Sequence, residues 1–291
     1  MLGDTRAYKA FRFGNAAVLI LLGLLCLFPV WHILAMSLSA SNAVEAGLVS
    51  VWPKGWTGES YALVMQNRTF LGSFGVSVLR VALGLAVNMF FIVTLAYPLA
   101  KERQDFHGRG VYAWLLMITM IFSGGLIPTY IVIRQLGLID SVWSLILPGA
   151  VPVWNTVLML NFFRGLPRSI EESAFIDGAG HLTVLMRLYL PLSAPAMATI
   201  ALFCIVGHWN AWFDGMIYIN TQEKYPLQTF LRLISVAADM REAASPELYN
   251  EVSDKTVRCA QVFIAMVPVL CIYPFLQKFF TKGIVMGSVK G

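Results

Sequence analysis

The sequence predicts an all-α fold: a polytopic membrane protein with six transmembrane helices and one helix–turn–helix on the cytoplasmic side. Of the 291 residues, 58% are hydrophobic and only 13% are charged, whereas a soluble domain carries about 25% charged residues. Six apolar stretches are each long enough to span a bilayer, for which a helix needs about 20 residues. One patterned polar stretch, between the fourth and fifth of them, contains signals for two short helices.

The six apolar stretches follow one another, separated by polar connections of different lengths. They run over residues 13–36, 70–99, 111–133, 142–163, 192–219 and 259–280. A transmembrane β-barrel would instead show alternating segments of about 10 residues. Several prolines fall inside the stretches, and bundled membrane helices tolerate them. We therefore expect one transmembrane domain covering residues 1–291, with no appended soluble domain.

The first stretch has two interpretations. Arg6, Lys9 and Arg12 precede an apolar run, and Ser41-Asn42-Ala43 loosely fits a cleavage site, as in a secretory signal peptide. The apolar run is longer than the 7–15 residues typical of a signal peptide. This length favours a retained helix.

The distribution of Lys and Arg predicts the orientation of the chain. With the N-terminus inside, the cytoplasmic segments hold twelve Lys and Arg against six Asp and Glu. Because positive residues concentrate on the cytoplasmic side of membrane proteins, we expect both termini in the cytoplasm. The segments at about 37–69, around Gly137 and at about 220–258 would then lie outside.

The cytoplasmic stretch 165–191 is too polar to span a membrane and too regular for a loose connector. Ser169 and Glu172 have the spacing of a capping box, in which Ser169 is the N-cap residue. Asp177-Gly178 is expected to end the first short helix, since Gly suits the left-handed conformation found there. A second helix should run from about Leu182 to a break at Pro191.

This stretch resembles the EAA loop of binding-protein-dependent ABC importer permeases. The family pattern is E-A-A, three residues, G, nine residues, then I-x-L-P. Glu172-Ser173-Ala174 corresponds to E-A-A, with Ser at the second position, and Gly178 and Leu188-Tyr189-Leu190-Pro191 follow at the family's spacing. Asp177-Gly178-Ala179 is similar to the carbohydrate branch.

The resemblance implies that this loop is a coupling helix docked on a separate ATPase subunit. It implies as partners a second homologous permease, a dimeric ABC ATPase that binds ATP and Mg²⁺, an extracytoplasmic solute-binding protein and an oligosaccharide substrate, in the cytoplasmic membrane of a bacterium. The residues that would couple to the ATPase are Glu171, Glu172, Ser173, Ala174, Asp177, Gly178, Ala179, Leu190 and Pro191. Glu172 could instead act mainly as a helix cap.

The C-terminal tail is short, glycine-rich and basic. It resembles the tail of the maltose-importer permease type, and more closely a subgroup that imports polysaccharide-derived oligomers such as alginate or pectin fragments. The resemblance implies that Gly287, Ser288 and Lys290 contact the ATPase. A frayed terminus is the alternative.

Candidates for the substrate path are polar and aromatic residues within the expected spans. His208, Trp209, Asn210 and Trp212 lie together in the fifth span, and polar groups in a membrane segment normally face the bundle interior. These aromatic rings could instead pack against the partner permease. Arg80 could attract an anionic sugar or extend its charged end toward the membrane surface.

Other functions find little support in the sequence. No P-loop, H-E-x-x-H or G-x-S-x-G motif occurs, so we expect no catalytic residue, no metal site and no cofactor bound by this chain. A net charge of +5 is too small to suggest nucleic-acid binding. An ion-coupled secondary sugar transporter remains the alternative, and it would need charged coupling sites within the spans. An intramembrane enzyme would need a catalytic dyad, which the sequence does not supply.

Overall fold

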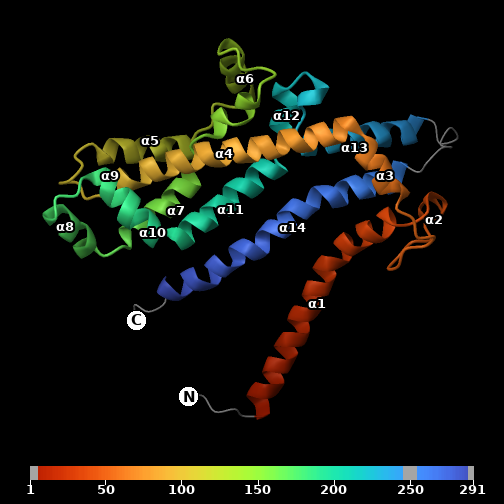
Figure 1. Ribbon diagram of the computed structural model, residues 1–291, viewed down its shortest axis with the longest axis horizontal. Coiled ribbons are helices and arrows are strands. Elements are labelled where there is room, and N and C mark those ends of the chain that lie inside the picture. Colours follow the sequence, from red (N-terminus) through yellow and green to blue (C-terminus); the bar gives the residue numbers. More distant parts are fainter. Residues whose placement is uncertain (1–5, 245–253, 288–291) are drawn as a thin grey trace. The chain divides into compact units, whose positions relative to one another are not determined.

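A computed structural model describes residues 6–244 and 254–287, and these residues form helices and no strands (Figure 1). Contacts divide the chain into two compact units. Unit 1 contains the described residues up to Arg68 together with those of Leu233–Val267, and unit 2 contains Thr69–Arg232 together with those from Pro268 onward. The helices α13 (Leu227–Ala244) and α14 (Asp254–Gly287) contribute to both units.

Unit 1 begins with the long helix α1 (Arg6–Ser37), which contains the first expected span. The short helices α2 (Ser41–Glu45) and α3 (Glu59–Gln66) follow it. The connecting segment folds back on the end of α1, where the Trp31 indole donates to the Val51 carbonyl over 2.7 Å. The hydroxyls of Ser37 and Tyr61 are also 2.7 Å apart, so α3 is held against α1.

Unit 2 is built around one long continuous helix, α4 (Arg68–Ala100). The other elements of this unit are α5 (Arg109–Ile121), α6 (Leu126–Gln135), the 3₁₀ turns η1 (Val142–Leu145) and η2 (Leu147–Gly149), α7 (Val153–Arg164), α8 (Arg168–Ile176), α9 (His181–Val184), the π-helical η3 (Leu185–Tyr189), α10 (Leu190–Leu192), α11 (Ala194–Asn210), α12 (Phe213–Tyr218) and η4 (Gln222–Lys224).

The main core of unit 2 lies where α4, α7, α11 and the helix–turn–helix meet. Figure 1 shows α7 and α11 beside α4. The fully buried side chains of this core include Ile92, Met159, Phe163, Val184 and Ile200. The helix–turn–helix is therefore attached to the same core as the apolar helices.

Three of the expected spans are interrupted. Residues 111–133 form α5 and α6, which are bent by 115° at a break where Gly125 has φ +81°. Residues 142–163 form 3₁₀ turns and α7, bent by 49°. Residues 192–219 form α11 and α12, with a gap at 211–212. The prediction of continuous helices is wrong here. Glycines and prolines lie at the first two breaks, and at the third the carbonyls of Ala211 and Trp212 accept from the side chains of Arg80 and Thr229.

Three described segments are long and apolar enough to cross a membrane without a break. They are Tyr8–Ser37, Arg68–Ala100 and Lys255–Ile272, and three bent pairs bring the number of spans to as many as six. The helix α13 is a departure from the sequence prediction, which treats residues 220–258 as a polar external segment. Leu227, Phe230 and Leu231 are buried and hold its first turns in unit 2.

Candidate functional site

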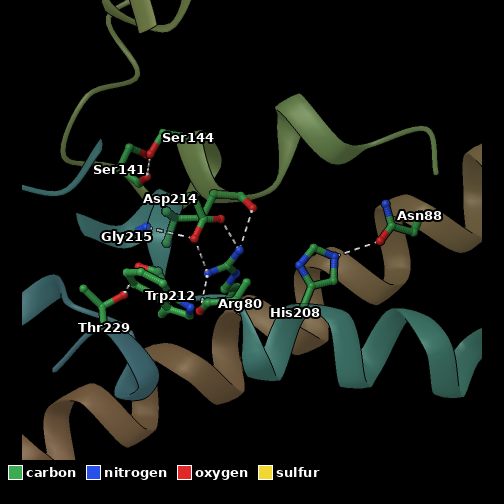
Figure 2. Close-up of polar contacts among 11 residues, drawn as sticks. Arg80, Asn88, Ser141, Ser144, His208, Trp212, Asp214, Gly215 and Thr229 are labelled. Atoms are coloured by element: carbon green, nitrogen blue, oxygen red, sulfur yellow. Dashed lines mark hydrogen bonds and ion pairs between the residues drawn. The ribbon is translucent and has the colours of Figure 1, made fainter. Parts of the chain in front are cut away.

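A row of polar and small residues runs along one face of α4. Arg80, Gly84 and Asn88 are spaced by four residues, which places them on the same side of a helix. This row faces the two regions where the neighbouring helices break, at residues 145–152 and at 211–212 (Figure 2). Non-helical backbone within a membrane requires such partners, because no water is available to satisfy its carbonyl groups.

Arg80 binds both broken regions at once. Its guanidinium donates to the carbonyl of Leu145 over 3.4 Å and to that of Ala211 over 3.3 Å. It also forms an ion pair with Asp214, in which Nη1 and Oδ1 are 3.1 Å apart. Arg80 is only 2% exposed. The alternative in which its charged end extends to the membrane surface is therefore wrong, since Asp214 and two carbonyls bind that end inside the unit.

Asn88 and His208 form the second polar group of this row. The Asn88 amide donates to the carbonyls of Gly149 and Ala150 over 2.8 and 3.0 Å. Its oxygen therefore remains as the acceptor for His208 Nε2, at 2.8 Å. Gly84 permits this contact, because a Cβ at that position would overlap the imidazole ring. Figure 2 shows the His208 ring directed at Asn88.

These groups line a cavity of about 350 Å³. Its walls are formed by Arg80, Asn88, Ser144, Leu145, Pro148, Gly149, Pro152, Asn155, Phe203, Cys204, Gly207, His208, Asp214 and Tyr218. A mostly apolar hollow with a few convergent polar groups is the usual form of a small-molecule site. The cavity could hold a group the size of a sugar ring.

The expected path residues divide into two sets. Arg80 and His208 line the cavity, whereas Trp209, Asn210 and Trp212 do not. Trp209 is buried and packs edge-to-face on Phe74. Asn210 is exposed, and the Trp212 ring lies 5.3 Å from the guanidinium carbon of Arg232.

The polar stretch 165–191 forms the expected helix–turn–helix. The first helix, α8, ends at Ile176 with Asp177 as its C-cap residue, and Gly178 follows in the left-handed region with φ +83°. That conformation strongly favours glycine. The second helix begins at His181 and continues without a gap through η3 to Leu192.

Two details of this helix–turn–helix differ from the prediction. The prediction of a capping box is wrong. The helix α8 begins at Arg168, its N-cap residue is Pro167, and no side chain caps the helix. The Ser169 carbonyl instead accepts from the Ser173 hydroxyl over 2.7 Å. Pro191 also does not break the second helix. The π turn before it changes the hydrogen-bond register, and proline has no N–H group that needs an acceptor.

A buried ion pair ties the helix–turn–helix to the end of α4. Lys101 pairs with Glu171 of α8, and the Tyr189 hydroxyl donates to the same carboxylate over 2.7 Å. The Lys101 ammonium also lies 4.0 Å from the centre of the Tyr97 ring. Burial lowers the pKa of Lys101, and its hydrogen bond to Glu171 acts in the opposite direction. No sequence motif marks Lys101, so the sequence analysis did not identify it as a site residue.

The other residues of the expected coupling set lie on two sides of this element. Ala174, Ala179 and Leu190 pack against the core. Glu172, Ser173, Asp177, Gly178 and Pro191 are exposed. Ile176 is 86% exposed on the same outer side. A polar cleft of about 780 Å³ opens beside the element, and Glu171, Glu172, Arg164, Arg168 and His181 are among its lining residues.

A third polar cluster lies at Asp140, between α6 and η1. Its carboxylate accepts from the Thr221 amide and hydroxyl over 2.9 and 2.7 Å and from Lys224 over 2.7 Å. These bonds hold the pKa of Asp140 well below its usual value. They join the loop after α6 to the segment that follows α12.

Two further expectations concern the C-terminal tail and metal binding. Gly287 is the last residue of α14, whereas Ser288 and Lys290 lie outside the described residues. Among the described residues, no three His, Cys, Asp or Glu side chains lie together as metal ligands would.

Comparison with known proteins identifies the family. No family model matches the chain. Protein LplC of Bacillus subtilis (strain 168) is 41% identical over 289 residues, covering 99% of this chain and 97% of its own length. The polygalacturonan/rhamnogalacturonan transport system permease protein YtcP of the same organism is 38% identical over 278 residues, covering 94% of this chain and 96% of its own.

A solved structure agrees with these relatives. It is a chain of a bacterial ABC transporter involved in the import of the acidic polysaccharide alginate. It is 34% identical, covers 96% of this chain and 100% of its own, and superimposes with a TM-score of 0.85. The chain therefore belongs to the permeases of ABC importers and is a transmembrane subunit of such a transporter.

Proposed function

We propose that this permease imports oligosaccharides released from an acidic polysaccharide. It pairs with a second homologous permease, receives its substrate from an extracytoplasmic binding protein, and is driven by a separate dimeric ATPase that binds ATP and Mg²⁺. The observation that carries this proposal is full-length similarity to a polygalacturonan/rhamnogalacturonan permease at 38% identity and to an alginate importer at 34%. Both polymers are acidic, and this points to a uronate-containing substrate.

The helix–turn–helix of α8–α10 is the element that contacts the ATPase. Its outer side presents Glu172, Asp177 and the exposed apolar Ile176, and an apolar group rimmed by polar ones is typical of a protein contact. On its inner side, Glu171 is bound to Lys101 and Tyr189. A push on α8 is thus transferred to the end of α4 rather than absorbed by a loose connector.

The helix α4 links this contact to the cavity. Lys101 follows its last residue, and Asn88 lies 13 residues earlier, which is about 20 Å along a helix. Because Asn88 and Arg80 bind the broken ends of neighbouring helices, a shift of α4 changes the shape of the cavity between them. This connection gives the transporter a path from ATP-driven closure to movement at the substrate.

The cavity forms part of the substrate path. Arg80 does not serve as a free cation for a uronate, since Asp214 neutralises it. Asn88 and His208 are better suited to hydrogen-bond sugar hydroxyls, while the exposed Asn210 and Trp212 can contact the sugar or the partner permease. The acidic groups of the substrate would then be recognised mainly by the binding protein and the second permease.

The orientation follows from the charge distribution. The stretch 165–191 and both termini lie in the cytoplasm, and the Asp140 cluster lies on the outer side of a bacterial cytoplasmic membrane. The proposal assigns to Gly287, Ser288 and Lys290 of the tail a contact with the ATPase.

Reconstitution of the whole transporter tests the proposal. The two permeases, the ATPase and the binding protein are placed in liposomes, and uptake of labelled oligogalacturonate, alginate oligomers and a neutral maltooligosaccharide is compared. We expect uptake of an acidic oligomer that requires ATP and the binding protein. Uptake of only the neutral sugar would overturn the substrate class, and uptake driven by an ion gradient without ATP would favour a secondary transporter.

A further inference from the structure

The surface of α5 is unusually apolar and open. Val111, Trp114, Leu115, Ile118 and Ile121 are each more than half exposed. Leu116 is the buried residue of this helix. A helix that packs on one protein neighbour buries an apolar stripe of about 100°, whereas apolar residues cover nearly the whole circumference of α5. An apolar solvent, as lipid chains provide, matches this distribution better than a single protein contact.

A groove runs along this helix and begins at three basic residues. The groove has a volume of about 920 Å³ and is lined by Trp114, Leu115 and Ile118, together with Arg103, His107 and Arg109 at its polar end. The same three basic residues line an adjoining hollow of about 620 Å³. Ile118 lies nine residues beyond Arg109, so the apolar part extends about 13 Å from the basic end.

The three basic residues have no carboxylate partner among the described residues. The acid that lines the adjoining hollow is Glu102. Glu102 is itself occupied, since it forms an ion pair with Arg168 and accepts a hydrogen bond from Gln104 over 3.0 Å. The groove therefore combines a positive end with an apolar length, which is the complement of an anionic headgroup attached to acyl chains.

The position of the groove fits a lipid. The residues 101–108 connect the two apolar helices α4 and α5. Lys101 directly follows the end of α4, and Arg109 is the first residue of α5. This connection lies where such helices leave the hydrocarbon region. Tyr112 and Trp114 near the start of α5 are the aromatic residues that favour the membrane–water interface.

We propose that this groove binds an acidic phospholipid. The phosphate lies at Arg103, His107 and Arg109, and an acyl chain lies along Trp114, Leu115 and Ile118. The lipid fills the groove in the assembled transporter and anchors α5 beside α4.

The test measures lipid binding to the purified, assembled transporter in detergent. Phosphatidylglycerol and phosphatidylcholine with identical acyl chains are titrated, and bound lipid is detected by native mass spectrometry. We expect preferential binding of phosphatidylglycerol. The variants Arg103→Gln and Arg109→Gln should each weaken it by about fivefold, the effect of one basic residue near an acidic membrane surface. The matched control Arg134→Gln, at the far end of α6, should leave it unchanged.

A second measurement identifies what covers the groove. A photoreactive benzoylphenylalanine replaces Leu115 in the same transporter, and the mass of the crosslinked product is determined. A product carrying one phospholipid supports the proposal. A product joined to the second permease or to the ATPase would overturn it, as would equal phosphatidylglycerol binding by wild type, Arg109→Gln and Arg134→Gln.

Discussion

The ion pair between Arg80 and Asp214 offers the sharpest test of the structure. The substitution Asp214→Asn removes one charge while keeping the shape of the side chain. The amide oxygen can still accept from the Gly215 amide, which lies 2.8 Å from Asp214 Oδ1. The change therefore isolates the charge that faces Arg80 inside the unit.

The expected loss of stability is worked from the burial of the two partners. Removal of one partner of a fully buried ion pair costs about 3–5 kcal/mol, because the other charge remains buried and uncompensated. The Arg80 side chain is 3% exposed, but that of Asp214 is 28% exposed. Arg80 also keeps its carbonyl partners at Leu145 and Ala211. We therefore expect a loss of about 2–3 kcal/mol, below the fully buried range.

The assay is reversible unfolding of the purified permease by titration with a denaturing detergent. Asp177→Asn is the matched control, since Asp177 is exposed and its substitution should change the free energy of unfolding by less than about 0.5 kcal/mol. If Asp214→Asn were as stable as this control, the ion pair would not hold the broken helices together, and the account of the polar row on α4 would be wrong.

Three further predictions concern the helix–turn–helix and the Asp140 cluster. Gly178→Val should lower the free energy of unfolding by about 1–2 kcal/mol because φ is +83°, and it should abolish ATP-driven uptake. The control Gly180→Val, at φ −83° with open space around it, should retain both stability and uptake. Lys101→Met should destabilise the permease by about 3 kcal/mol, and Glu171→Leu added to it should restore part of the loss in a double-mutant cycle. The pKa of the Asp140 carboxylate is lowered in the folded protein, so the ionised carboxylate should stabilise the fold fully above the ordinary aspartate pKa of about 3.9. This contribution should be lost as the pH falls from there toward the pKa in the folded protein. In this window the free energy of unfolding of Asp140→Asn should therefore depend less on pH than that of the wild type.

Each of these predictions has an outcome that contradicts it. Equal uptake by Gly178→Val and wild type would remove the left-handed turn from the coupling mechanism. Additive losses in the Lys101 and Glu171 cycle would mean that the two side chains do not interact in the folded protein. Unfolding of Asp140→Asn with an unchanged acid profile would assign the acid sensitivity to other carboxylates.

Local features of the sequence predicted the class and the position of the helix–turn–helix. Apolar length and low charge are properties of a short window, so the spans at 13–36 and 70–99 fall within α1 and α4. Gly178 was predictable because a helix end needs a residue that tolerates a positive φ. The capping-box prediction was wrong although its spacing was correct, since α8 begins at Arg168 with Pro167, not Ser169, as its N-cap residue.

The contacts that join distant segments could not be predicted in this way. The sequence allowed Arg80 either to attract an anionic sugar or to extend toward the membrane surface. Its burial depends on Asp214, which lies 134 positions away. Lys101 resembled any cytoplasmic lysine, and its partner Glu171 is 70 positions away. The breaks in the expected spans share this cause, because a helix can end inside a membrane only where another segment binds its freed carbonyls.

The sequence by itself determined that the chain is a polytopic membrane protein and where its helix–turn–helix lies, since both depend on composition and on spacing within a few tens of residues. Only the tertiary structure decided which charges are buried, where the helices break and which groups line the cavity. Those features depend on which helix faces meet, and the meeting of faces is a property of the packed unit rather than of any one segment.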